Sequence, residues 1–110
     1  MSEHNYFLKK QNKDERLLSL NQNDIHAIFE WLNHFEKINN YKQVEFDETE
    51  NILANGPITE YRDGIWVKSR NLKHILTWFK YYPNPNDYDK EIAKIVEDTL
   101  NPPEPSKLKK

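Results

Sequence analysis

Three side chains of a predicted helix have the spacing of a metal site. His26, Glu30 and His34 lie four residues apart in turn, and side chains four apart share one face of a helix, where two of them can hold a cation. Each such step also turns the side chain about 40° around the helix, so one pair would need further ligands from elsewhere. We favour a solvated helix face, because this spacing alone is a weak signal. A metal-dependent role is kept as an alternative hypothesis, and no cofactor is expected.

Paired carboxylates for acid–base catalysis are a second kind of chemistry to consider. Acidic side chains cluster at Glu45, Asp47, Glu48 and Glu50, with Glu60 further along. Glycosidase-like chemistry needs two carboxyl groups on either side of a cleft, and a domain of 110 residues with a short sheet has little room for one. We therefore expect a solvated acidic loop, or a docking edge for a basic partner.

The composition disfavours nucleophilic and cofactor-dependent catalysis. The chain has no cysteine and only two glycines, Gly56 and Gly64, and no serine lies in a G-x-S-x-G turn. Without cysteine there is no thiol nucleophile and no zinc–thiolate site. With so few glycines, neither a P-loop nor a dinucleotide-binding fingerprint can be formed. We expect a protein that is not an enzyme.

The segment from Ile65 to Tyr82 is the most informative part of the chain. It contains no acidic residue and interleaves lysine and arginine with tryptophan, phenylalanine and tyrosine. The whole chain has 16 basic and 18 acidic side chains and a net charge of -2. A basic, aromatic surface on an acidic protein suits an acidic partner, because tyrosine and tryptophan are enriched where binding energy concentrates.

The predicted partner-binding residues form two groups of opposite charge. The basic aromatic face comprises Trp66, Lys68, Arg70, Lys73, Lys80 and Tyr81, and the acidic patch comprises Glu45, Asp47, Glu48 and Glu50. Nucleic acid is the alternative ligand of the basic face, since lysines neutralise phosphates and aromatic rings stack on bases. We favour a protein partner, because the net charge is negative and no RRM, KH or helix-turn-helix signature is present.

These features together predict a small non-enzymatic binding protein that acts by docking on another macromolecule. An inhibitor, an immunity protein or a phage-encoded modulator of a host system would have this character. No stretch approaches the roughly 18 apolar residues of a membrane span, and the N-terminus MSEHNYFLKK lacks the apolar core of a signal peptide. We expect a cytoplasmic protein with no membrane partner.

Helical periodicity predicts three helices that would position these residues. The first runs from about Asn23 to Ile38, the second from Ser69 or Asn71 to about Tyr82, and the third over Tyr88–Leu100. In each, apolar residues recur every three or four positions, so that one face can be buried. A short polar side chain precedes each and can cap it.

Strand patterns predict the rest of the fold. Alternation at 43–46 and the short apolar run 52–54 indicate strands, and Asp-Gly at 63–64 is typical of a tight turn in a hairpin over 58–68. The expected fold is therefore an α+β domain, with about three short antiparallel strands packed against three helices. We expect one domain over 1–110, with a partly mobile lead-in at 1–18, in which Tyr6–Leu8 could add an edge segment, and a disordered tail at 101–110.

Overall fold

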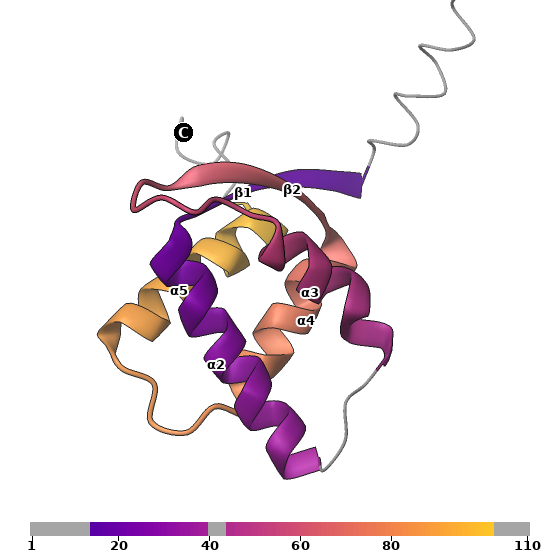
Figure 1. Cartoon of the computed structure of the whole chain (residues 1–110), viewed down its shortest axis with the longest axis vertical. Helices are drawn as coiled ribbons and strands as arrows, with labels where there is room; N and C mark the ends of the chain where they lie inside the picture. The colour runs from indigo at the N-terminus through magenta and orange to yellow at the C-terminus, as the bar shows by residue number, and fades with distance from the viewer. Residues whose placement is uncertain (1–13, 40–43, 103–110) are drawn as a thin grey trace, which may run out of the picture.

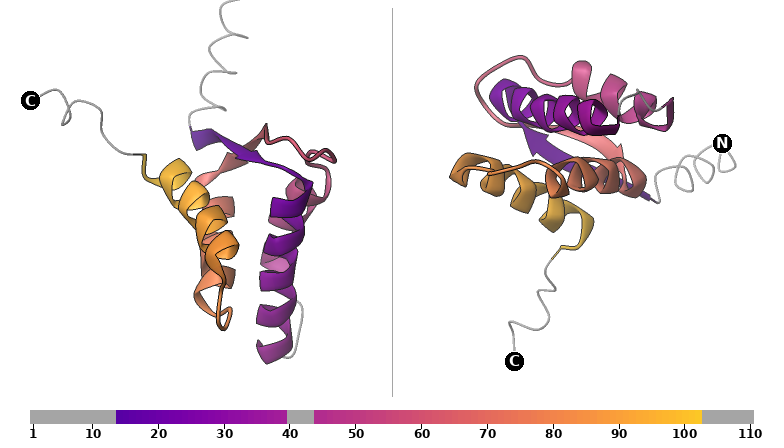
Figure 2. Two further views of the ribbon diagram at one scale, coloured as in Figure 1. Left: turned by 90° about the vertical axis from the view of Figure 1, so that its left-hand side faces the viewer. Right: turned by 90° about the horizontal axis from the view of Figure 1, so that it is seen from below.

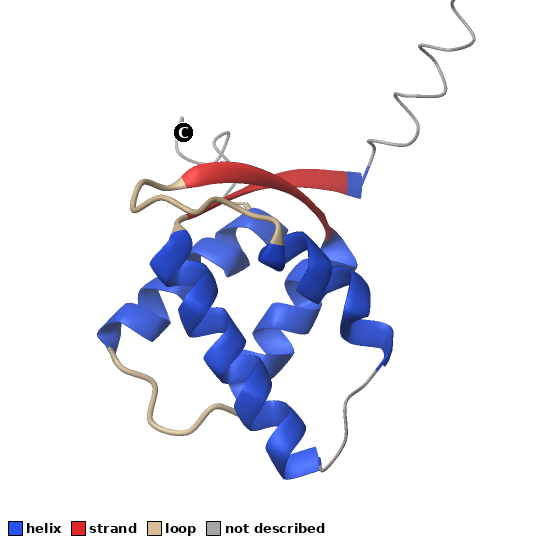
Figure 3. Cartoon of the chain, viewed as in Figure 1, coloured by secondary structure: helices blue, strands red, loops and turns tan. Residues whose placement is uncertain are grey.

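The elements follow one another in the order strand, helix, helix, strand, helix, helix. The structure, a computed structural model, describes residues 14–39 and 44–102 (Figure 1). In these residues the elements are β1 (Glu15–Leu20), α2 (Gln22–Asn39), the 3-10 helix η2 (Val44–Phe46), α3 (Asp47–Ala54), β2 (Asp63–Lys68), α4 (Ser69–Lys80) and α5 (Asp87–Leu100). The α+β class is confirmed, but the described sheet has two strands and the described helices number four (Figure 3).

The antiparallel ribbon of β1 and β2 lies across one end of the helices. Figure 2 shows α2 and α3 on one side of the molecule and α4 with α5 on the other, with the ribbon over their ends. Leu18 pairs with Ile65 and Leu17 with Trp66. Because successive residues of a strand point to opposite faces, Leu18 and Val67 are buried against the helices, whereas Leu17 and Trp66 are 52% and 61% exposed on the outer face.

The three predicted helices are confirmed as α2, α4 and α5. Their apolar faces form the core together with the inner face of the ribbon, and the fully buried apolar side chains of these three helices are Ile28, Trp31, Leu32, Leu72, Ile75, Trp78, Ile92 and Val96. Ile38 does not join this core. It is 54% exposed in the last turn of α2, where the helix extends past the packed region.

The same polar arrangement starts three of the helices. Asn21 Oδ1 accepts the Asp24 N–H at 2.8 Å and Asp24 Oδ2 accepts the Asn21 N–H at 2.9 Å, and Asn86 and Asp89 repeat this at 2.7 and 3.0 Å. At α4, Asn71 Oδ1 accepts the backbone N–H three residues earlier at 2.8 Å. These bonds satisfy amides that a helix start leaves without partners. Asp24, Asn71 and Asp89 are buried, so each can also bond to another element.

Asp24 connects the start of α2 to two later segments. Arg62 donates to its carboxylate at 2.7 and 3.1 Å, and the Tyr88 hydroxyl donates to it as well. Burial acts to raise the pKa of Asp24, but the hydrogen bonds from Arg62 and Tyr88 outweigh it and lower that pKa. Burial and the hydrogen bond to Asp24 raise the pKa of Tyr88 to about 12. Asp89 is tied in a similar way by Trp31 Nε1, which donates to it at 3.1 Å.

The predicted hairpin over 58–68 is wrong. Residues 63–68 pair with β1 instead, so that residues 15–18 of the expected lead-in are part of the sheet. Gly64 lacks the positive φ that a two-residue type I′ turn requires. Ile58 and Tyr61 are 80% and 74% exposed and lie outside any strand. The sequence pattern correctly predicted a strand ending at Lys68. It was wrong about the partner, which is β1 and not residues 58–62.

The predicted strands at 43–46 and 52–54, and the acidic loop between them, are also wrong. Residues 44–54 form η2 and α3. Phe46, Thr49 and Leu53 are buried at helical spacing, whereas Val44 is 79% exposed, so the apparent alternation did not mark a buried face. The acidic residues occupy the first turn of α3, where negative charge favours a helix. Gln43, Tyr6–Leu8 and residues 103–110 lie outside the described part of the chain.

Candidate functional site

The two predicted patches of opposite charge meet at Glu48. Arg70 Nε and Nη2 donate to the two carboxylate oxygens of Glu48 at 2.8 and 2.9 Å, and Lys68 Nζ lies 3.9 Å from Glu48. Hydrogen bonds from Arg70 and then from Asn71 lower the pKa of Glu48 to about 2. We therefore assign Glu48, Lys68 and Arg70 to the contact between α3 and the start of α4.

A chain of polar side chains lies behind this ion pair. Asn71 Nδ2 donates to Thr49 Oγ1 at 2.8 Å, and Thr49 Oγ1 lies 2.8 Å from His74 Nδ1. Burial lowers the pKa of His74, and which of the two groups donates in this hydrogen bond depends on the tautomer of the ring. The ring also packs edge-on against Phe46, with centroids 4.9 Å apart. These bonds hold α3 against α4. We therefore assign Thr49, Asn71 and His74 a structural role.

Lys73 and Lys80 lie on the opposite, exposed face of α4. Neither forms an ion pair with any residue that the structure describes. Lys80 Nζ lies 5.9 Å from the centroid of the Tyr81 ring. Tyr81 is 50% exposed, and its other contact is with Phe35, whose ring centroid is 5.5 Å away. Three residues of the predicted basic aromatic face therefore remain accessible to a partner: Lys73, Lys80 and Tyr81.

An apolar groove lies between α4 and α5, next to these lysines. Its cavity volume is about 430 Å³, and it is lined by Leu76, Phe79, Lys90, Ala93, Lys94 and Glu97. Lys73 and Lys80 lie three residues before and four residues after Leu76, and residues so spaced are neighbours on a helix surface. We call this surface the α4–α5 groove: its floor is Leu76, Phe79 and Ala93, Lys90 and Lys94 of α5 line one side, and Lys73 and Lys80 of α4 lie next to Leu76 on the other.

Trp66 and most of the acidic patch lie elsewhere on the molecule. Trp66 is on the outer face of the ribbon, opposite Leu17. Glu45 is exposed in η2, and Asp47 and Glu50 belong to the first turn of α3. The predicted basic aromatic face is therefore divided between the ribbon, the α3–α4 contact and the outer side of α4.

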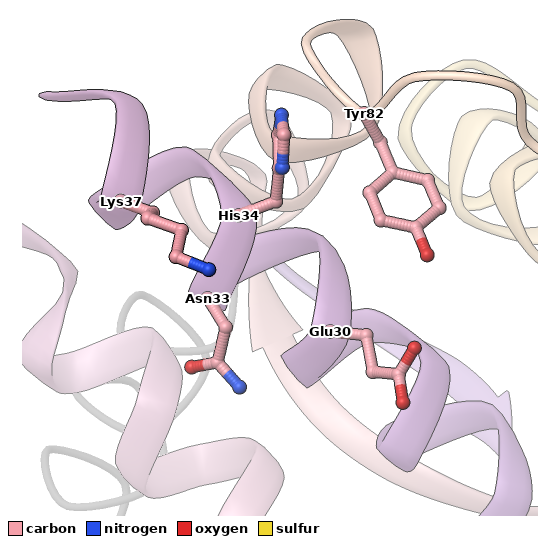
Figure 4. Close-up of a pocket in the computed structure, with 5 residues that line it drawn as sticks. All are labelled: Glu30, Asn33, His34, Lys37 and Tyr82. Carbon is pink, nitrogen blue, oxygen red and sulfur yellow. The ribbon is translucent and has the colours of Figure 1, made fainter.

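A second hollow lies between α2 and the chain that follows α4. Its cavity volume is about 370 Å³, and Figure 4 shows its lining residues, Glu30, Asn33, His34, Lys37 and Tyr82. Tyr82 lies across the hollow from the α2 side chains, and its ring meets His34 edge-on with centroids 5.9 Å apart. Burial, followed by the charge of Glu30, raises the pKa of Tyr82.

The candidate metal series on α2 divides between two hollows. Glu30 and His34 line the hollow of Figure 4 beside the cationic Lys37, whereas His26 lines another hollow next to Gly56. Within residues 14–39 and 44–102, no three histidine or acidic side chains are grouped so that they could hold a metal ion. The structure thus offers no described site for the metal hypothesis.

Sequence reasoning missed the α5 side of the groove. Lys90 and Lys94 are one helical turn apart on the exposed side of α5, beside the small Ala93. Their spacing is visible in the sequence, but the packing of α5 on α4 is what places them beside Leu76 and Phe79 of α4. The sequence signal that could have indicated this side of the groove is a pair of lysines, Lys90 and Lys94, on either side of an alanine in an amphipathic helix.

Comparison with known proteins leaves function to be inferred from the chain itself. No protein-family model matches the chain, and no curated protein or solved structure matches it significantly. None of the helices in the described residues has the length and apolar character needed to cross a membrane.

Proposed function

We propose that this chain is a small non-enzymatic docking protein that binds another protein through the exposed face of α4. It acts by occupying a partner's surface, as an inhibitor, an immunity protein or a phage-encoded modulator would. One observation carries the proposal: Lys73 and Lys80 have no acidic partner among the described residues, whereas Arg62, Lys68 and Arg70 each have one. Cations left without internal partners beside an apolar groove suit an acidic protein surface.

The division of the aromatic residues supports a protein partner over nucleic acid. Single-stranded nucleic acid is held by cations and stacking rings in one groove. Trp66 lies on the ribbon, away from the lysines of α4, and Tyr81 is already packed on Phe35. The side chains next to Lys73 and Lys80 are apolar ones of the α4–α5 groove, and a phosphate backbone gains nothing from contact with them.

Charge reversal on α4 tests this proposal. Lys73→Glu and Lys80→Glu, singly and together, are compared with wild type for capture of partners from an extract of the source cells. Lys37→Glu is the matched control, because it makes the same change of charge at an exposed lysine of α2 that also has no described ion pair. We expect the double variant to lose capture by about tenfold or more, while its thermal midpoint stays near that of wild type.

Two results would count against the proposal. Capture that is equal for wild type and the double variant would remove α4 from the binding surface. Binding to a single-stranded oligonucleotide that weakens steeply with salt, and that depends on Lys73 and Lys80, would favour nucleic acid as the ligand.

A further inference from the structure

We infer that the α4–α5 groove binds an acidic amphipathic helix of a protein partner. The inference rests on the proposed docking function and adds the site and the chemistry of the occupant. It depends on three features of the groove: its apolar floor, the lysines of α4 and α5 around that floor, and its position between two helices.

The floor of the groove calls for apolar side chains in the occupant. Leu76 and Phe79 are half-buried, so part of each side chain remains in contact with solvent. The inner side of Phe79 packs on Trp31, with ring centroids 4.9 Å apart, and this contact holds the ring in place. Ala93 is small enough to leave space between the two helices, and the cavity there is about 430 Å³. Covering this floor removes apolar surface from water.

The charges around the groove call for an acidic occupant. Lys73 and Lys80 belong to α4, and Lys90 and Lys94 belong to α5. Asp98 pairs with Lys94 at 3.3 Å and Glu91 pairs with Arg62 at 3.1 Å, whereas Glu97 lines the groove and Asp87 lies three residues before Lys90. Lys73, Lys80 and Lys90 form no ion pair with any residue that the structure describes, so these three lysines against Asp87 and Glu97 leave a local charge of +1, in a chain whose net charge is -2. The local reversal of sign favours carboxylates on the partner.

The shape of the site favours a helix over an extended strand. A strand is recognised through main-chain hydrogen bonds at a free sheet edge, and the groove is lined by side chains of two helices. An amphipathic helix offers apolar residues at i, i+3, i+4 and i+7, which suit a groove between helices, with acidic residues beside them to meet the lysines.

Synthetic peptides test this inference directly. The probe is a fluorescein-labelled peptide of about 16 residues, with leucines on one helical face and glutamates elsewhere. One control peptide has the same composition with its leucines spread around the helix, and a second control is polyglutamate. Binding to the full chain is measured by fluorescence anisotropy, and we expect the amphipathic peptide to bind about tenfold more tightly than either control.

Variants of both helices and of the floor locate the site. Lys73→Glu and Lys90→Glu should each weaken peptide binding by about fivefold or more, while Lys37→Glu, the matched control, should leave it nearly unchanged. Leu76→Ala should weaken it about tenfold through lost apolar contact. The two lysine variants are at exposed positions, so they remain informative even if Leu76→Ala disturbs the fold.

Several outcomes would overturn the inference. They are an absence of peptide binding, equal binding of the rearranged peptide or polyglutamate, and equal weakening by Lys37→Glu. If the peptides fail while Lys73→Glu with Lys80→Glu still abolishes partner capture, the docking function stands and the helix-binding groove is wrong. If neither experiment responds to the lysines, both proposals fall.

Discussion

The two buried tryptophans differ in the hydrogen bonding of the indole N–H, and comparing them gives a measure of what that hydrogen bond contributes. Trp31 and Trp78 are both 0% exposed. Trp31 Nε1 donates to Asp89 at 3.1 Å, whereas Trp78 Nε1 has no hydrogen-bond partner among the described residues. Substitution of either by phenylalanine removes the same atoms, so the transfer and cavity costs largely cancel when the two variants are compared.

We expect Trp31→Phe to be clearly the more destabilising change. It leaves a carboxylate oxygen of Asp89, which is 8% exposed, without its donor, and such a loss costs about 1.5–3 kcal/mol. Trp78→Phe instead removes a buried N–H that the described residues leave unpaired, so it recovers part of a desolvation cost. A difference of this size corresponds to roughly 6–20 °C in the thermal midpoint.

Urea unfolding followed by far-ultraviolet circular dichroism at pH 7 measures the difference. Circular dichroism does not depend on tryptophan fluorescence, which every substitution of a tryptophan alters. Trp66→Phe is the control, because Trp66 is 61% exposed and its substitution should change the free energy of unfolding by less than about 0.5 kcal/mol. If Trp78→Phe proves as costly as Trp31→Phe, then packing around the indole dominates and the reasoning from the hydrogen bond is refuted.

Three further predictions concern Arg62, His74 and Asn84. Arg62→Ala should lower the free energy of unfolding by about 1–3 kcal/mol, because it strips the main donor from the fully buried Asp24; urea unfolding measures this, and a change below about 0.5 kcal/mol would contradict it. Burial lowers the pKa of His74 from 6.5, so the unfolded chain takes up the proton more readily. This contribution to stability should therefore be present above pH 6.5 and be lost as the pH falls below it. His74→Gln should flatten this part of the pH profile, and an unchanged slope would rule His74 out as its source. Asn84 has a φ of 52°, so Asn84→Ala should cost about 1 kcal/mol and Asn84→Gly much less; equal thermal midpoints for the two variants would argue against this backbone effect.

The elements that could be predicted are those whose signal is local. In α2, α4 and α5, apolar residues recur at helical spacing, and the caps lie within three residues of the helix starts. Contacts between residues so close in sequence leave a readable pattern, because each helix carries its own periodicity. The buried face of each helix was therefore visible before its packing partners were known.

The elements that were missed depend on distant partners. The ribbon pairs Leu18 with Ile65, and only this pairing turns residues 15–18 of the expected lead-in into part of a strand. The short helix α3 has a weak apolar pattern, and its place depends on Glu48 and Thr49 meeting Arg70 and Asn71 in α4.

The candidate site shows the same division. Its basic and aromatic residue types were evident in the segment 65–82, but their availability to a partner was not. Folding paired Arg70 with Glu48 at the surface, placed Trp66 on the ribbon and left Lys73 and Lys80 exposed. The lysines of α5 joined them only because α5 packs against α4.

The sequence by itself determined three amphipathic helices, the α+β class and the cluster of basic and aromatic residues in the segment 65–82. Periodicity and composition are properties of neighbouring residues, so they can be read without a structure. Tertiary structure alone decided which charges neutralise each other and which flank the apolar groove. Those outcomes depend on distances between residues far apart in the chain, such as Glu48 and Arg70, which only the packing of the helices sets.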